Sequence, residues 1–159
     1  MFVGDYTGMF IPVDREKGQV YDLSVSIREI NDGLNISWES TTFDDGKLKA
    51  TTYSIDFLET ERKNILTAAE KKNLFGGRGP LDPINGEPYA WARITDRTLI
   101  VYMMLIADDG GYEVQTYNRT LKDNGDFITQ YSRFRNGQVV RTLKATLNRQ
   151  SATRMEKNK

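Results

Sequence analysis

Apolar and polar residues alternate along most of this chain, and this period-two pattern is typical of half-buried β-strands. Leu23, Val25 and Ile27, for example, alternate with polar residues. Similar runs cover residues 3–13, 34–39, 52–57, 89–95, 98–107, 112–121, 126–135 and 138–149. The pattern predicts an all-β chain of about nine strands.

Short turn sequences separate these runs. The most informative are Asp45-Gly46, Asp109-Gly110, Asn124-Gly125 and Asn136-Gly137, with Asn31-Asp32-Gly33 and Asp96-Arg97 at two further junctions. Asp-Gly and Asn-Gly favour two-residue hairpin turns, because both central residues take positive φ. So many sequential hairpins predict an antiparallel up-and-down β-barrel, whose closure removes the sheet edges; a β-sandwich is the structural alternative.

Residues 59–88 interrupt the alternation. Residues 61–75 are predicted to form one short helix, ended by a Gly-rich run at residues 76–80. A long insertion beside a barrel is interpreted as a lid or a mouth loop. We therefore expect a barrel domain over residues 1–149, with this insertion in mid-chain, and a polar tail over residues 150–159.

Hairpin register predicts which side chains share a face. In the first half, two-residue turns place an apolar set on one face, which its composition marks as the interior: Leu23, Val25, Ile27, Leu34, Ile36, Trp38, Tyr53, Ile55 and Phe57. In the second half, the same procedure gives two neighbouring rows. One row reads Trp91, Tyr102, Tyr117, Ser132, Arg141, and the other reads Arg93, Ile100, Arg119, Gln130, Leu143.

The second-half rows combine aromatic rings with arginines, amides and hydroxyls. An inward arginine needs a partner, and a ligand carboxylate or phosphate would serve. The opposite face is also apolar, however, and this strip would need cover from the helix or from a second copy of the chain in a homodimer: Leu99, Val101, Met103, Leu105. The alternative is a bulge that reverses the faces and leaves the arginines in solvent.

Composition narrows the chemistry. The 22 Lys and Arg residues balance 22 Asp and Glu residues, so nothing favours nucleic acid as a partner. The chain has neither cysteine nor histidine, which excludes disulfides, thiolate nucleophiles, zinc-thiolate sites and histidine-ligated metals. We predict no metal site and no cofactor. No membrane span or signal peptide is visible, so we expect a cytoplasmic protein, or an exported one whose leader has been removed.

The sequence resembles the lipocalin-like (calycin) superfamily. Lipocalins open with Gly-x-Trp on the first strand and place an arginine late in the barrel over that ring; here Gly4-Asp5-Tyr6 stands at the motif, and Arg149 is similar to the arginine. The resemblance implies barrel closure through a cation–π contact between Tyr6 and Arg149. Related fatty-acid-binding proteins hold a carboxylate with interior Arg and Tyr, which Tyr117, Arg119 and Arg141 resemble in residue type.

These observations favour a protein that binds a small amphipathic, anionic ligand inside the barrel. The predicted ligand-binding residues are Trp38, Tyr53, Trp91, Tyr102, Tyr117, Arg119, Gln130, Ser132 and Arg141. Phe134 is also expected to line the interior. Two alternatives remain open. One is a barrel enzyme of isomerase, cyclase or decarboxylase type that uses Tyr and Arg, with Glu39 or Glu113. The other is a module that binds a protein partner through the apolar strip.

Overall fold

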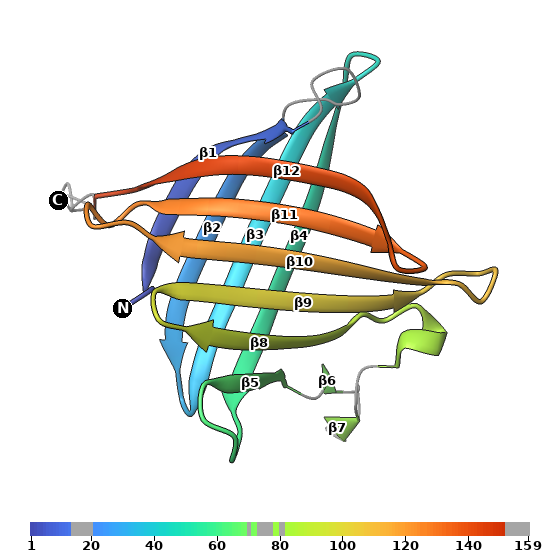
Figure 1. The fold of residues 1–159 in the computed structure, drawn as a ribbon, viewed down its shortest axis with the longest axis horizontal. Coiled ribbons are helices and arrows are strands. Elements are labelled where there is room, and N and C mark those ends of the chain that lie inside the picture. Colours follow the sequence, from blue (N-terminus) through green and yellow to red (C-terminus); the bar gives the residue numbers. More distant parts are fainter. Residues whose placement is uncertain (14–20, 70, 73–77, 80–81, 152–159) are drawn as a thin grey trace, which may run out of the picture.

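The computed structural model describes residues 1–13, 21–69, 71–72, 78–79 and 82–151. Within them, ten strands form a closed antiparallel barrel in which each strand pairs with its neighbours along the chain (Figure 1). The strands are β1 (Gly4–Pro12), β2 (Tyr21–Ile30), β3 (Gly33–Asp44), β4 (Lys47–Glu59), β5 (Ile65–Ala68), β8 (Tyr89–Thr95), β9 (Thr98–Ile106), β10 (Tyr112–Leu121), β11 (Phe127–Arg135) and β12 (Gln138–Arg149). The prediction of an all-β up-and-down barrel is confirmed.

The barrel is built from two halves whose strands cross steeply. In Figure 1, β1 to β4 run down the picture behind β8 to β12, which run across it. The pairing of β1 with β12 closes one side of the barrel, and the short β5 links β4 to β8 on the other. A separate two-stranded sheet pairs β6 (Lys71–Lys72) with β7 (Arg78–Gly79).

The predicted helix over residues 61–75 is wrong for the part that the structure describes. Residues 61–64 form a turn, in which Asn64 takes a φ of 61°, and β5 follows at once. The apolar pair in β5 looks helical in isolation, but its backbone pairs with β4 and β8, which would otherwise be open edges. The only helix among the described residues is the 3₁₀ turn η1 (Pro83–Asn85). Residues 70, 73–77 and 80–81, including Gly76 and Gly77 of the predicted Gly-rich run, lie outside the described residues.

Turn length decides the faces in the second half of the chain. Asn136 and Gly137 form a two-residue turn with φ values of 48° and 82°, as predicted. At Asp109-Gly110 and Asn124-Gly125 the predicted two-residue turns are wrong: both loops have three residues, closed by Ala107 N–Gly111 O and Lys122 N–Asp126 O bonds of 2.8 Å. In each loop the glycine takes the left-handed third position. Each extra residue moves the following strand by one position and exchanges its faces.

A bulge between Arg133 and Phe134 shifts the pairing of β11 with β12 by one residue. Because the two loops have three residues each, Tyr117 lies opposite Val101 and Tyr131, not opposite Tyr102 and Ser132. The pairing of Trp91 with Tyr102 is confirmed, but that pair lies on the outer face.

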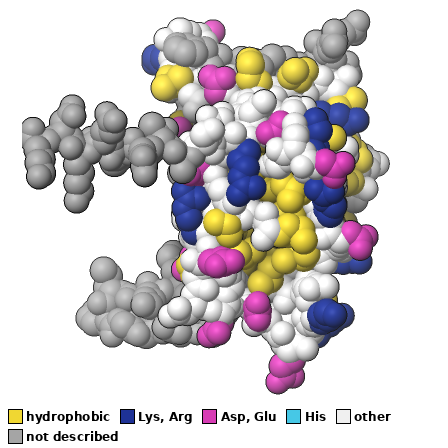
Figure 2. Space-filling view, turned by 90° about the vertical axis from the view of Figure 1, so that its left-hand side faces the viewer, with side chains coloured by type: hydrophobic (Ala, Val, Ile, Leu, Met, Phe, Trp, Pro, Cys, Tyr) yellow, Lys and Arg dark blue, Asp and Glu magenta, His cyan; other side chains and the backbone are white. Residues whose placement is uncertain are grey.

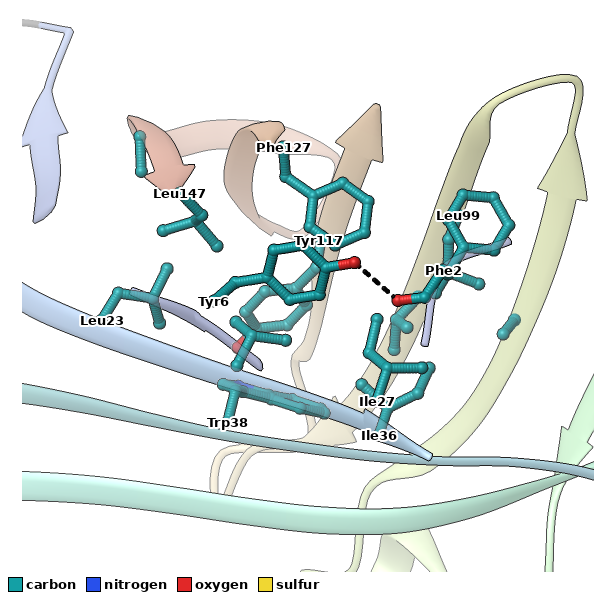
Figure 3. Packing of buried hydrophobic residues seen from close by; sticks show 14 of the residues in the cluster. Phe2, Tyr6, Leu23, Ile27, Ile36, Trp38, Leu99, Tyr117, Phe127 and Leu147 are labelled. Carbon is teal, nitrogen blue, oxygen red and sulfur yellow. Dashed lines mark hydrogen bonds between the residues drawn. The ribbon is translucent and has the colours of Figure 1, made fainter. Parts of the chain in front are cut away.

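In the core, buried side chains from both halves of the barrel pack against one another (Figure 3). The first-half interior face is confirmed, since Ile27, Ile36 and Phe57 are fully buried and the rest of that set is buried or packs against the core. The predicted outward apolar strip is wrong: Leu99, Val101 and Met103 are fully buried and Leu105 packs partly against the core. With the register shifted by one residue, this face of β9 points inward, and no second copy is needed to cover it.

Tyr6 and Arg149 close the barrel as the resemblance implies. They are direct partners in the β1–β12 register, and the guanidinium carbon lies 5.8 Å from the centre of the tyrosine ring. The Tyr6 ring is fully buried against Phe127, and its hydroxyl donates a 2.8 Å hydrogen bond to the Phe2 carbonyl, drawn in Figure 3. Arg149 also donates to the Val3 carbonyl at 2.5 Å. The two ends of the chain are therefore tied together at this seam.

Candidate functional site: a cavity in the barrel

A cavity of about 310 Å³ lies inside the barrel, between the two crossing halves. Its lining combines six aromatic side chains with hydroxyl, amide and guanidinium groups: Phe10, Tyr21, Trp38, Ser40, Thr51, Tyr53, Gln115, Tyr117, Tyr131, Arg141 and Leu143. Residues of β1 to β4 form one wall and residues of β10 to β12 the other. Thr51 is exposed, so the cavity opens to solvent along β4.

Four aromatic rings form a continuous floor across the barrel. Trp38 lies 5.1 Å from Tyr53 and 5.0 Å from Tyr117, and Tyr117 lies 5.0 Å from Tyr131, measured between ring centres. Trp38 and Tyr53 face each other in the β3–β4 register, while Tyr117 and Tyr131 do so in β10–β11. A floor of this kind offers a flat or extended apolar group a large contact area.

Arg141 supplies the positive charge of the cavity. Its Nη2 donates a 2.5 Å hydrogen bond to the Tyr21 hydroxyl, and its guanidinium carbon lies 4.7 Å from the centre of the same ring. Among the described residues, no carboxylate lies within salt-bridge distance of it. The tyrosine holds the guanidinium in place but does not neutralise it, so the charge is available to a ligand.

A chain of polar side chains runs along the inner face of β10. The Tyr117 hydroxyl donates to Gln115 Oε1 at 3.0 Å, and Gln115 Nε2 donates to Glu113 Oε1 at 2.7 Å. Arg133 Nε lies 3.3 Å from Glu113 Oε2. Arg133 thus neutralises the Glu113 carboxylate. Glu113 is therefore not a counter-ion for Arg141.

Burial keeps the floor tyrosines neutral. Burial is the main reason why the pKa of Tyr131 is raised to about 12, and the neighbouring charge of Glu113 adds to this rise. Burial also raises the pKa of Tyr117. The pKa of Tyr53 is also raised, mainly by burial. These phenols therefore act as hydrogen-bond donors at any physiological pH and do not serve as bases.

Arg119 lies below this floor and does not line the cavity. It is fully buried, and its guanidinium carbon lies 5.3 Å from the ring centres of both Trp38 and Tyr117. Burial lowers its pKa to about 10, so the group still carries its proton at neutral pH. The prediction that Arg119 is interior is confirmed, but two rings lie between it and the cavity.

The structure brings together only part of the predicted ligand-binding set. Trp38, Tyr53, Tyr117 and Arg141 line the cavity. Trp91 and Tyr102 stack on each other at 4.9 Å on the outer face, since the alternate residues of β8 and β9 are buried inside. Gln130 and Ser132 also lie on the outer face, where Ser132 is covered by its neighbours Thr116 and Thr142. Phe134, expected inside, lies beyond the bulge and is partly exposed.

Sequence reasoning missed several lining residues. Tyr131, Gln115 and Tyr21 were not predicted. The assumed loop lengths turned Tyr131 outward, whereas Gln115 shares the predicted inner face of Tyr117 but was not included in the site, and Tyr21 is the first residue of its strand. A three-residue reading of the Asp-Asn-Gly loop would have found Tyr131, since three-residue hairpins also place glycine in the left-handed position.

Other hollows lie elsewhere on the molecule, among them one of about 270 Å³ lined by residues 59–66 and Ile94. A shallow hollow runs along Tyr89 and Trp91 beside β5. Figure 2 shows another face, where hydrophobic side chains gather in the middle with acidic and basic side chains around them. Among the described residues, no group of Asp and Glu is arranged to hold a metal ion, and no helix is long and apolar enough to cross a bilayer.

Comparisons with known proteins identify no relative. No protein-family model, no curated protein and no solved structure matches this chain.

Proposed function

We propose that this protein binds a small amphipathic anion in the barrel cavity, with the apolar body on the aromatic floor and the anionic group at Arg141. The observation that carries the proposal is an aromatic cavity of about 310 Å³ whose arginine has no carboxylate partner among the described residues. Such a combination of apolar lining and a few polar groups is typical of sites that bind small molecules.

The size of the cavity suits a ligand rather than ordered water alone. A volume of about 310 Å³ lies at the lower end of the range of known small-molecule sites, roughly 300–1,000 Å³. An apolar group on the floor would cover Trp38, Tyr53 and Tyr131, and each aromatic contact adds about 0.5–1.5 kcal/mol beyond the buried area. This favours a ligand with a planar or compact apolar part.

The polar groups favour a negative charge at one end of the ligand. Arg141 is a donor only, and Tyr53 and Tyr131 are phenols kept neutral by burial. A carboxylate, sulfonate or phosphate accepts hydrogen bonds from all of these groups, whereas an amine would oppose Arg141. Glu113 does not compete for Arg141, because it pairs with Arg133.

We also propose that the barrel is of the lipocalin-like kind. The closed antiparallel barrel and the contact of Arg149 with the ring of Tyr6 at the strand seam support this assignment. Small closed barrels of this kind have an interior that can hold one small ligand, which agrees with the proposed site.

The experiment is a titration with two matched fluorescent probes, anionic 1-anilinonaphthalene-8-sulfonate and uncharged N-phenyl-1-naphthylamine. Arg141→Leu is compared with wild type and with Arg93→Leu, which removes an exposed arginine on the outer face of β8. Native mass spectrometry of freshly purified protein accompanies the titration, to detect a ligand that copurifies.

We expect Arg141→Leu to weaken binding of the anionic probe about 10- to 100-fold, as the loss of a charged hydrogen bond implies, while the uncharged probe changes less than about twofold. Arg93→Leu should bind both probes like wild type. Equal affinities for both probes in all three proteins would show that Arg141 is not an anion site, and no probe binding at all would contradict the proposed function.

A further inference from the structure

We propose that Arg119 and Thr129 form a second site, for a small monovalent anion, inside the barrel below the aromatic floor. The site goes beyond the proposed function, because Arg119 does not line the cavity. It uses different residues from the ligand site, so either proposal can fail without the other.

The first observation is that part of the hydrogen-bonding capacity of Arg119 is unused. The residue is fully buried, and its Nε and Nη1 atoms have no hydrogen-bond partner among the described residues. No described carboxylate lies within salt-bridge distance either. A buried charge without a partner is strongly destabilising, and arginine is rarely buried unless it is paired.

The second observation is independent of the first. Thr129 is directly opposite Arg119 in the β10–β11 register; it is fully buried, and its Oγ1 also lacks a partner. On the other side of Thr129, its partner on β12 is Ala145, which is also buried and whose side chain is a single methyl group. Orphaned polar atoms from two neighbouring strands therefore face the same small region of the interior.

The rings around Arg119 do not supply what is missing. Trp38 and Tyr117 stabilise the positive charge through their faces, each with its centre 5.3 Å from the guanidinium carbon. They do not accept the hydrogen bonds of Nε and Nη1. The arginine offers only donors and the threonine hydroxyl adds another, so the missing partner is an acceptor with negative charge.

The position of the two rings selects a small ion. Trp38 and Tyr117 line the cavity on one side and contact Arg119 on the other, with their ring centres 5.0 Å apart. A bulky ligand in the cavity is separated from Arg119 by these rings. A halide or another ion of similar size needs little more room than a water molecule, and it would satisfy several donors at once.

The test measures thermal unfolding while chloride replaces gluconate at constant ionic strength. Wild type is compared with Arg119→Met, Thr129→Val and Arg141→Met. If chloride binds the folded state, the melting temperature of wild type rises with the logarithm of the chloride concentration above the dissociation constant, by about 5–10 °C at 100 times that constant. The rise should vanish in Arg119→Met, shrink in Thr129→Val and persist in Arg141→Met.

A second measurement decides the case even if Arg119→Met does not fold. Wild-type crystals grown with bromide should show an anomalous peak within hydrogen-bond distance of the Arg119 guanidinium. A water molecule there in place of bromide would overturn the proposal. So would a chloride effect that is the same in wild type and Arg119→Met, or stabilisation by amphipathic carboxylates alone, which would assign Arg119 to the cavity ligand.

Discussion

Replacing Trp38 by alanine tests whether the aromatic floor is a structural as well as a binding element. Trp38 is 3% exposed and contacts Tyr53 and Tyr117, and it covers one face of Arg119. A side chain of this kind buries about 150–250 Å², which at about 25 cal/mol per Å² corresponds to roughly 4–6 kcal/mol as an upper bound. Truncation of buried tryptophan costs about 3–5 kcal/mol, and we expect Trp38→Ala to fall in that range.

The chain offers a matched control in its second tryptophan. Trp91 stacks on Tyr102 on the outer face and is only partly buried, so Trp91→Ala should cost less than about 1.5 kcal/mol. Urea unfolding followed by circular dichroism measures both variants without relying on tryptophan emission. For a chain of 159 residues, the expected loss for Trp38→Ala corresponds to a fall in melting temperature of about 6–20 °C.

The comparison of the two variants decides the outcome. Trp38→Phe should recover at least half of the loss, because it keeps an aromatic ring against Tyr53 and Arg119. Equal losses in Trp38→Ala and Trp91→Ala, or a loss below about 1 kcal/mol at Trp38, would refute the assignment of Trp38 to the interior.

Three further predictions concern pH, turn geometry and barrel closure. Because the folded-state pKa of Tyr131 is raised to about 12, its contribution to stability is complete below pH 10 and is lost as the pH rises through 12. In Tyr131→Phe, the free energy of unfolding measured in urea should therefore fall less steeply between pH 9 and 11 than in wild type. An unchanged slope would contradict this prediction. Gly137→Val should cost about 1–3 kcal/mol, because residue 137 takes a φ of 82°; an unchanged melting temperature would refute this. Tyr6→Phe should cost about 0.5–1.5 kcal/mol through the bond to Phe2, measured by chemical denaturation, and no cost would show that the bond is not stabilising.

The sequence by itself determined the fold class and the hairpin positions. Period-two alternation reflects the pleat of a strand, and the Asp-Gly and Asn-Gly pairs mark where the chain reverses, so both are local properties. The inner face of the first half followed directly, since Trp38 and Tyr53 pair as predicted across a two-residue turn. The contact between Tyr6 and Arg149 was also foreseen, through the resemblance.

Only the tertiary structure decided which residues of the second half face inward. An Asp-Gly or Asn-Gly pair suits a two-residue turn as well as a three-residue loop, and the difference of one residue exchanges the faces of the next strand. Here two such loops and one bulge turned Trp91 and Tyr102 outward while keeping Tyr117 and Arg141 inside.

The tertiary structure also decided that β5 is a strand. Ile65 and Leu66 lie in a segment whose local pattern is helical, and its conversion to β5 depends on the free edges of β4 and β8. Those edges are far apart in the sequence, and their unpaired backbone groups outweigh local propensity. The cavity with its unpartnered Arg141, and the buried Arg119 beneath it, exist only once the barrel has closed around them.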